Sequence, residues 1–420
     1  MISLIPAIFI LGYLAIAFEH SIHINKTASA LLAGVLCWTF YILSGIEEIH
    51  TVMEHLSHHL GAISEILFFL LGAMTIVELV DAHHGFKIIT DRIQTRNSIS
   101  LLWIIAFVSF FLSSVLDNLT TSIVMVSLLR KLVHKGQKRL LMSAVVIIAA
   151  NSGGAWSPIG DVTTTMLWIG GQISALHIIK SVFLPSVISI LVPLAFFSYQ
   201  LRKDKDLPVL EKSTSQTPDG STLMFFLGLG SLLFVPIFKT ITHLPPYMGI
   251  LLGLSVVWIA SEIIHKDKDE EAKRPFSAGH ALSKIDSSSV LFFLGILLAI
   301  SCLESLGLLA RLAVWMDQTI GNQSIIVASI GVASAIIDNV PLVAASMGMY
   351  PLSAYPMDHS LWEMMAYCAG TGGSILIIGS AAGVAVMGME KIDFIWYLKR
   401  VSLVALIGYL AGTFTYILLS

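Results

Sequence analysis

The chain has 420 residues, of which 56% are hydrophobic and only 12% charged, and its mean hydropathy is +0.85. This small number of charged side chains cannot cover the surface of a water-soluble globule of this size, which excludes a soluble globular protein. The composition instead predicts an all-α protein that crosses a lipid bilayer many times. The net charge of −3 gives no sign of a nucleic-acid partner.

Apolar runs of spanning length lie near residues 2–18, 27–45 and 64–80. Between the second and third runs, residues 47–59 contain no Lys or Arg and predict an interfacial helix. This segment holds His50, His55, His58 and His59. Histidine is the side chain whose ordinary pKa lies nearest to physiological pH, so a pH-sensing role and a merely interfacial role both stay open for this cluster.

Residues 97–129 form an apolar run whose only ionisable group is Asp117. A straight helix of this length would be about 50 Å long, which exceeds a hydrocarbon core of roughly 30 Å, while two crossings would need about forty residues. Basic residues lie on both sides of the run. We therefore predict a re-entrant hairpin with Asp117 and Asn118 near its tip, and with both ends on the cytoplasmic side.

The next apolar run covers residues 140–179, and its first part, residues 140–170, is interrupted by Gly153-Gly154, Pro158 and Gly160. These residues break a helix, and irregular backbone at membrane depth requires a protein-lined or water-lined cavity. The segment is therefore expected to be a discontinuous helix. A span near 180–200 and a polar cytoplasmic linker, residues 202–221, follow.

The second half repeats this plan. Spans are expected near 222–238, 246–264, 288–308 and 396–419, with a hairpin at about 323–350 and a broken helix at about 361–389. Asp338 is the only charged residue of the second hairpin. Like the first, this carboxylate is expensive at membrane depth and is read as functional by default.

Matching motifs indicate an internal repeat. Asp117-Asn118 corresponds to Asp338-Asn339, and Ser152-Gly153-Gly154 corresponds to Thr371-Gly372-Gly373 at nearly the same distance along the chain. Residues 1–201 and 222–420 are then two repeats of five transmembrane helices each. An odd number of crossings per repeat makes the two repeats inverted relative to each other. With this topology, 21 of the 24 Lys and Arg residues lie on the cytoplasmic side and both termini lie outside.

Two hairpin tips and two broken helices should converge on one site rich in hard oxygen ligands. The candidates are Asp117, Asn118, Asn151, Ser152, Asp161, Thr163, Thr164, Asp338, Asn339, Thr371 and Ser374, with Ser113, Ser334 and Glu304 in supporting positions. No Cys or His accompanies them, which favours an alkali cation over zinc or copper. The expected Na⁺ ligands are Asp117, Asn118, Asp338 and Asn339. No further cofactor is expected.

Carboxylates at such a site can exchange ions. Burial favours the protonated acid, whereas a bound cation favours the carboxylate, so Na⁺ and H⁺ compete for the same oxygens. One Na⁺ that displaces protons from both Asp117 and Asp338 would exchange for two protons. The alternative is that these aspartates, and Asp161 before Thr163, only cap helices, and the two roles are compatible.

The combination of motifs resembles the NhaD-type sodium/proton antiporters. The resemblance rests on the two SxxxDN patterns that end at Asn118 and Asn339, on residues 151–164 and on residues 371–374. It extends over nearly the whole chain, and it places the chain in a superfamily with divalent-anion/sodium symporters and arsenite exporters. It implies Na⁺ or Li⁺ exchange for H⁺ across the bacterial inner membrane, with a homodimer and elevator-like movement. In that membrane, the outside termini expected from the charge count would be periplasmic. Gly370 and Ser380 replace Asn151 and Asp161 in the second half, so the site should be asymmetric.

Three other functions remain as alternatives. An anion symporter or arsenite exporter of the same superfamily is disfavoured by two aspartates at the tips. An intramembrane aspartyl protease also needs two buried aspartates, but the segment before Asp161 lacks the first glycine of the Gly-x-Gly-Asp pattern. A passive channel would have no need of coupled carboxylates.

Overall fold

A computed structural model describes residues 4–93, 95, 97–202 and 218–420, and its regular elements in these ranges are all helices. Seven of the described helices are long and apolar enough to cross a membrane, and several shorter apolar helices accompany them. The all-helical, multi-span fold expected from composition is confirmed. Most of the predicted linker, residues 203–217, lies outside the described residues, and the division into two inverted repeats stays a prediction.

The first helices of the chain are α1 (Leu4–Ala17), α2 (Glu19–Ile22), α3 (Lys26–Ser44), α4 (Ile49–Ala82) and α5 (Lys87–Thr90). The prediction of a separate interfacial helix at residues 47–59 is wrong, because α4 continues without a break from Ile49 through the span to Ala82. No proline or exposed glycine pair interrupts this segment, so the helix runs on for 34 residues.

The predicted first hairpin and broken helix appear as two pairs of short helices. They are α6 (Ser98–Ser113) and α7 (Asn118–Leu132), then α8 (Gln137–Ala155) and α9 (Val162–Ile169), followed by the long α10 (Ala175–Leu201). Asp117 and Asp161 each begin the second helix of a pair as its N-cap. Their side chains accept hydrogen bonds from backbone N–H groups of the first turn, which stabilises each restart of the helix.

The second half has the same order of elements. It contains α11 (Ser221–Thr242), α12 (Pro246–Ile264), α13 (Glu270–Lys273), η1 (Arg274–Phe276), α14 (Ala278–Lys284), α15 (Ser287–Ser305), α16 (Leu308–Ile320), α17 (Gln323–Ala333), α18 (Asn339–Met349), α19 (Ser360–Gly372), α20 (Ala381–Glu390), α21 (Phe394–Tyr397), η2 (Leu398–Ser402) and α22 (Leu403–Leu419). The gap between α17 and α18 ends at Asp338, and the gap between α19 and α20 ends at Ser380, so each again supplies an N-cap.

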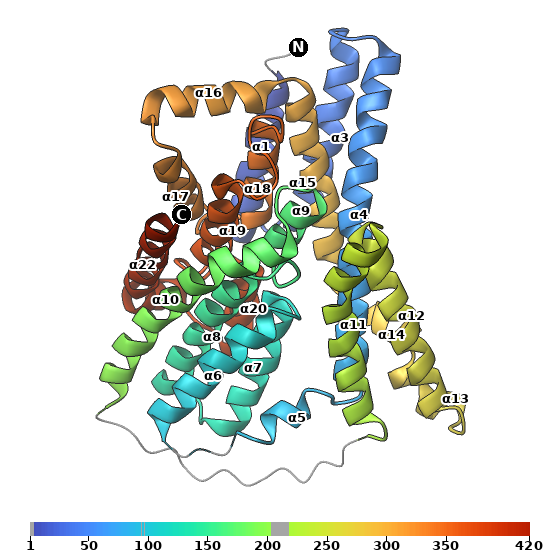
Figure 1. Ribbon diagram of the computed structural model, residues 1–420, viewed down its shortest axis with the longest axis vertical. Coiled ribbons are helices and arrows are strands. Elements are labelled where there is room, and N and C mark those ends of the chain that lie inside the picture. The colour runs from blue at the N-terminus through green and yellow to red at the C-terminus, as the bar shows by residue number, and fades with distance from the viewer. Residues whose placement is uncertain (1–3, 94, 96, 203–217) are drawn as a thin grey trace.

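The helices form two groups (Figure 1). In the hairpin group, α6 and α7 pack on α8, α17 and α18 pack on α19, α10 packs along α22, and α9 and α20 contact α18 and α7 from the other half. In the scaffold group, α3 packs on α1 and α15, and α12 packs on α11 and α4. Each half therefore contributes matching helices to both groups.

Glycines let the helices of the hairpin group approach within backbone contact. A β-carbon on Gly153 would collide with the carbonyl oxygen of Phe110 in α6, and one on Gly372 would collide with that of Gly331 in α17. The same packing of a broken helix against the first hairpin helix thus occurs in both halves. No larger residue fits at these two positions without moving backbone.

A buried glutamate connects α20 to the first hairpin. The Glu390 carboxylate accepts a 2.7 Å hydrogen bond from Arg130 Nε of α7 and another 2.7 Å bond from Arg139 Nε of α8. The glutamate side chain is fully buried, and the Arg139 side chain is only 12% exposed. Because a buried carboxylate needs such partners, this cluster fixes α20 of the second half to two helices of the first.

Candidate functional site

The two hairpin tips meet at a single carboxylate. Asn118 Nδ2, in the first turn of α7, donates to Asp161 Oδ2 at 3.0 Å, and Asn339 Nδ2, in the first turn of α18, donates to the same oxygen at 3.5 Å. Asp161 is 2% exposed, and its other oxygen accepts from the backbone N–H of Thr163 at 3.1 Å. This carboxylate therefore caps α9 and joins both halves of the chain.

Asn151 links the breaks of the two discontinuous helices. Its Oδ1 accepts from Asn118 Nδ2 at 3.0 Å, and its Nδ2 donates to Ser374 Oγ and Ser380 Oγ, both at 2.9 Å. The asymmetry expected from Gly370 and Ser380 is present in this geometry. Ser380 takes the capping position that Asp161 has in the first half, and a β-carbon on Gly370 would lie 3.6 Å from Asp161 Oδ2.

Asp117 and Asp338 stand at the edges of this polar cluster. Asp117 Oδ1 accepts from the Thr120 N–H at 2.7 Å and Oδ2 accepts from its hydroxyl at 2.8 Å. Asp338 Oδ1 accepts from the backbone N–H of Val340 at 3.3 Å. Both carboxylates interact electrostatically with Asp161. The structure thus brings the three carboxylates into one electrostatic environment, with Asp161 as the central member.

Two of the predicted ligands, Ser152 and Thr371, make their hydroxyl hydrogen bonds away from the cluster. The Ser152 hydroxyl pairs with Ser189 of α10 at 2.8 Å, and the Thr371 hydroxyl donates to the Tyr367 carbonyl of its own helix at 2.6 Å. Thr163 contributes its backbone N–H to Asp161, while the hydroxyl of Thr164 is buried and has no hydrogen-bond partner among the described residues. Hydroxyls on either side of a helix break face different directions, so sequence position alone does not decide which face the site.

The supporting serines hold each hairpin to its broken helix. Ser113 donates to the Ala150 carbonyl at 2.6 Å, and Ser334 donates to the Ala369 carbonyl at 3.1 Å. Each carbonyl belongs to the residue that precedes Asn151 or its counterpart Gly370. Glu304 lies on α15 against Gly348 of α18, outside the asparagine cluster.

Lys26 is a site residue that the sequence motifs did not predict. Its Nζ lies 3.3 Å from Asp338 Oδ2, and the two side chains are 27% and 15% exposed. The available signal was its position as the first residue of a spanning helix, because a positive charge is unfavourable at a helix N-terminus unless a carboxylate is near.

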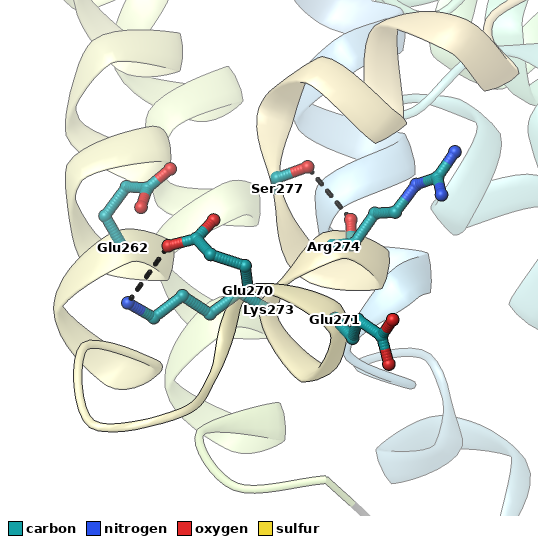
Figure 2. Close-up of a pocket in the computed structure, with 6 residues that line it drawn as sticks. All are labelled: Glu262, Glu270, Glu271, Lys273, Arg274 and Ser277. Atoms are coloured by element: carbon teal, nitrogen blue, oxygen red, sulfur yellow. Dashed lines mark hydrogen bonds and ion pairs between the residues drawn. The ribbon is translucent and has the colours of Figure 1, made fainter.

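A surface pocket lies away from these residues. It has a volume of about 430 Å³ and is lined by Glu262 of α12 and by residues of α13, η1 and the start of α14 (Figure 2). Its charged groups compensate one another, as in the 3.9 Å pair of Lys273 Nζ with Glu270 Oε1. None of the predicted site residues lines this pocket.

Comparison with known proteins gives the family. A family model described as "Citrate transporter" matches residues 13–370. Sodium/proton antiporter 2 of Arabidopsis thaliana is 52% identical over 416 residues, which cover 98% of each chain, and sodium/proton antiporter 1 of the same plant is 54% identical over 98% of this chain and 71% of its own length. The Na⁺/H⁺ antiporter NhaD of Alkalimonas amylolytica is 31% identical over 97% of this chain and 88% of its own length.

A solved transporter structure has a similar fold. The YdaH transporter of Alcanivorax borkumensis matches 88% of each chain with a TM-score of 0.57. At 14% sequence identity, this likeness shows a similar fold and nothing about function. Together with the spanning helices, these likenesses confirm the resemblance stated from the sequence motifs. The chain is a multi-pass membrane transporter of the citrate-transporter family, and within that family it belongs to the NhaD-type sodium/proton antiporters.

Proposed function

We propose that this protein exchanges Na⁺ or Li⁺ for H⁺ across a membrane, with Asp161 as the central cation and proton site and Asp117 and Asp338 on either side. The observation that carries the proposal is the Asp161 carboxylate, to which the asparagine of each hairpin tip donates a hydrogen bond. Any ion that binds this oxygen changes the contacts of both hairpins, which couples binding to the arrangement of both halves.

The donor set supports a small hard cation. Carboxylate, amide and hydroxyl oxygens of Asp161, Asn151 and Ser374 lie within one hydrogen-bonded network, and hard oxygen ligands suit alkali cations. Because Asn118 and Asn339 use Nδ2 to donate, their amide oxygens are available to a cation. A proton on Asp161 would remove the charge that attracts the cation, so the two ions exclude each other.

Alternating access is part of the proposal. The hairpin group contains every residue of the asparagine cluster, and the scaffold group contacts it mainly where α15 packs on α18 and α4 on α9. Movement of the hairpin group relative to the scaffold group would expose the site on one side at a time, as broken-helix transporters do. A homodimer, periplasmic termini and a bacterial inner-membrane location are further proposals, and the plant and bacterial relatives leave the type of membrane open.

Symport of a carboxylate is the competing function, because the family model carries the name of a citrate transporter. An anion would have to enter a cluster that already holds three carboxylates that interact electrostatically. Only Lys26 offers a positive charge close to them among the described side chains, and it is paired with Asp338. The charge of the site therefore favours a cation.

The test measures proton movement in everted membrane vesicles from cells that express this protein as the only added transporter. A pH-sensitive dye should report dequenching on addition of Na⁺ or Li⁺ and none on addition of K⁺. Asp161→Asn and Asp117→Asn should each abolish the response, since an amide cannot exchange a proton for a cation. Asp338→Asn should abolish it as well, because it removes a carboxylate that the cation needs.

Asp317→Asn is the matched control, because Asp317 lies in α16 away from the cluster, and it should retain the response. Uptake of labelled citrate into the same vesicles, with and without Na⁺, tests the competing function. Sodium-dependent citrate uptake without proton exchange would overturn the proposal, as would full exchange activity in the Asp161→Asn protein.

A further inference from the structure

We propose that the ammonium group of Lys26 is a built-in competitor of the transported cation at Asp338. This inference rests on the proposed cation exchange and adds a positioning residue to it. Lys26 Nζ lies 3.3 Å from Asp338 Oδ2 and occupies the carboxylate oxygen that does not cap α18. While the pair persists, that oxygen is not available to Na⁺.

The surroundings hold the ammonium in place. Its Nζ lies 4.6 Å from the centroid of the Phe292 ring, which is fully buried in α15. The Lys26 backbone N–H donates to Glu19 Oε1 at 3.2 Å, and the Asn25 side chain caps α3 one residue earlier. A side chain fixed at both its base and its charged end loses less freedom on pairing than an ordinary surface lysine.

The Lys26–Asp338 pair connects the two groups of helices. Lys26 belongs to α3 of the scaffold group, whereas Asp338 is at the tip of the second hairpin. The pair therefore joins the two groups of helices that the proposed exchange requires to move apart. A bound cation that takes the place of the ammonium would release this connection.

The other half of the chain lacks an equivalent. The helices α3 and α12 both have 19 residues, and Trp38 and Trp258 stand at the same place in each. At the first position, α3 has Lys26 and α12 has Pro246. Asp117, the counterpart of Asp338, accepts hydrogen bonds from the backbone N–H and the hydroxyl of Thr120. Only one of the two hairpin carboxylates thus has an internal cation among the described residues.

A further group beside Asp338 could serve an incoming cation. The hydroxyl of Tyr13 in α1 is buried, interacts electrostatically with Asp338 and has no hydrogen-bond partner within the described part of the chain. Its oxygen is a hard ligand of the kind that Na⁺ prefers. Displacement of Lys26 would leave this oxygen and Asp338 Oδ2 to the cation.

The experiment compares the apparent KM for Na⁺ in proteoliposomes at a fixed pH on both sides. Lys26→Met should lower KM about tenfold, the effect expected when a partly desolvated competing charge is removed, and it should not raise kcat in proportion. Lys26→Arg keeps the charge and should keep KM close to that of the unmodified protein. Phe292→Leu weakens the hold on the ammonium without touching the carboxylate, so it should lower KM by a smaller factor.

Lys239→Met is the matched control. Lys239 also lies over an aromatic ring, 4.7 Å from the Trp168 centroid, but it donates to a backbone carbonyl instead of pairing with an aspartate. Its KM should stay unchanged. An unchanged or raised KM in a Lys26→Met protein of native melting temperature overturns the inference, as does an equal fall in both methionine variants. If Lys26→Met does not fold, the Phe292→Leu result decides.

Failure of this inference can be told apart from failure of the proposed function. If the unmodified protein shows no exchange with Na⁺ or Li⁺, the proposed function is wrong and no KM can be measured. If the unmodified protein exchanges Na⁺ and only the predicted fall in KM is missing, the exchange function stands and Lys26 is not a competitor.

Discussion

At the scale of single residues, Asp161 combines two roles that are usually separate. Its Oδ1 caps α9 through the Thr163 N–H, while its Oδ2 accepts from the asparagines of both hairpin tips. The capping bond stabilises the charged carboxylate and fixes its direction, because a capping side chain must point at the first turn of its helix. An aspartate is therefore held in place before any ion arrives.

A second residue pair, His83 and His265, predicts how stability depends on pH. The two imidazoles are buried at the ends of α4 and α12, with their Nε2 atoms 3.1 Å apart and Phe276 stacked against His265. Burial lowers the pKa of His83 from 6.5 to about 4, and burial also lowers the pKa of His265. Below pH 6.5 the unfolded chain therefore binds protons that the folded protein excludes.

We accordingly expect the free energy of unfolding to fall as the pH drops from about 6.5 to about 4. His83→Phe removes this titrating group and should reduce the fall, which can be followed as the melting temperature in detergent at several pH values. His50→Phe is the control, because the His50 side chain is 80% exposed, and it should keep the original slope. An identical slope in the His83 variant would contradict this account.

The sequence predicted the chemistry of the site better than its contacts. Asp117, Asp338 and the three asparagines were found because polar groups in apolar runs are conspicuous. Lys26 was missed because its partner is 312 positions away, and only the folded chain brings the two together. The same holds for Glu390 and its two arginines in the first half.

At the scale of elements, breaks in helices were predicted more reliably than their continuation. The expected span at residues 246–264 has the same bounds as α12, and the hairpins and broken helices each appear as two short helices. These breaks are recognisable in the sequence because they contain glycines or a carboxylate within an apolar run. By contrast, the sequence of residues 47–59 does not show whether this polar segment forms a separate helix or continues into the following span. In the structure it continues, as part of α4.

The contact between each broken helix and its hairpin leads to a prediction about stability. Gly153→Ala should destabilise the protein by about 3 kcal/mol, because the new methyl group meets the Phe110 carbonyl of α6 and backbone cannot move aside cheaply. Gly372→Ala should do the same against Gly331. Thermal unfolding in detergent measures both.

Gly230→Ala in α11 is the matched control. A β-carbon at Gly230 meets no other atom within 4 Å, and alanine favours a helix over glycine, so this change should leave the melting temperature unchanged or raise it slightly. Equal melting temperatures for Gly153→Ala and Gly230→Ala would show that the helices of the hairpin group are not in contact as described.

At the scale of the whole molecule, the charges of the site predict how many protons are exchanged for each Na⁺. Lys26 neutralises Asp338, so the protons that one Na⁺ displaces would come from Asp117 and Asp161. This assignment keeps two protons per sodium but replaces Asp338, the second proton carrier expected from sequence, with Asp161. Such exchange moves net charge across the membrane.

We therefore expect a potassium diffusion potential, set with valinomycin, to drive Na⁺ movement in proteoliposomes that have no initial sodium or pH gradient. The direction should reverse with the sign of the potential. The Lys26→Arg protein, which keeps the positive charge, should behave in the same way. Sodium movement that is indifferent to the potential would establish electroneutral exchange and exclude the two-proton scheme.

The ion pairs of the buried Glu390 with Arg130 and Arg139 have a consequence for experiments that trap the protein in one state. Since these pairs tie α20 to α7 and α8, the three helices would move together in the proposed cycle, and a chemical cross-link between α20 and α7 should leave turnover intact. A cross-link from α3 to the tip of α18 should instead arrest the cycle, and so provide a homogeneous sample for imaging a single intermediate.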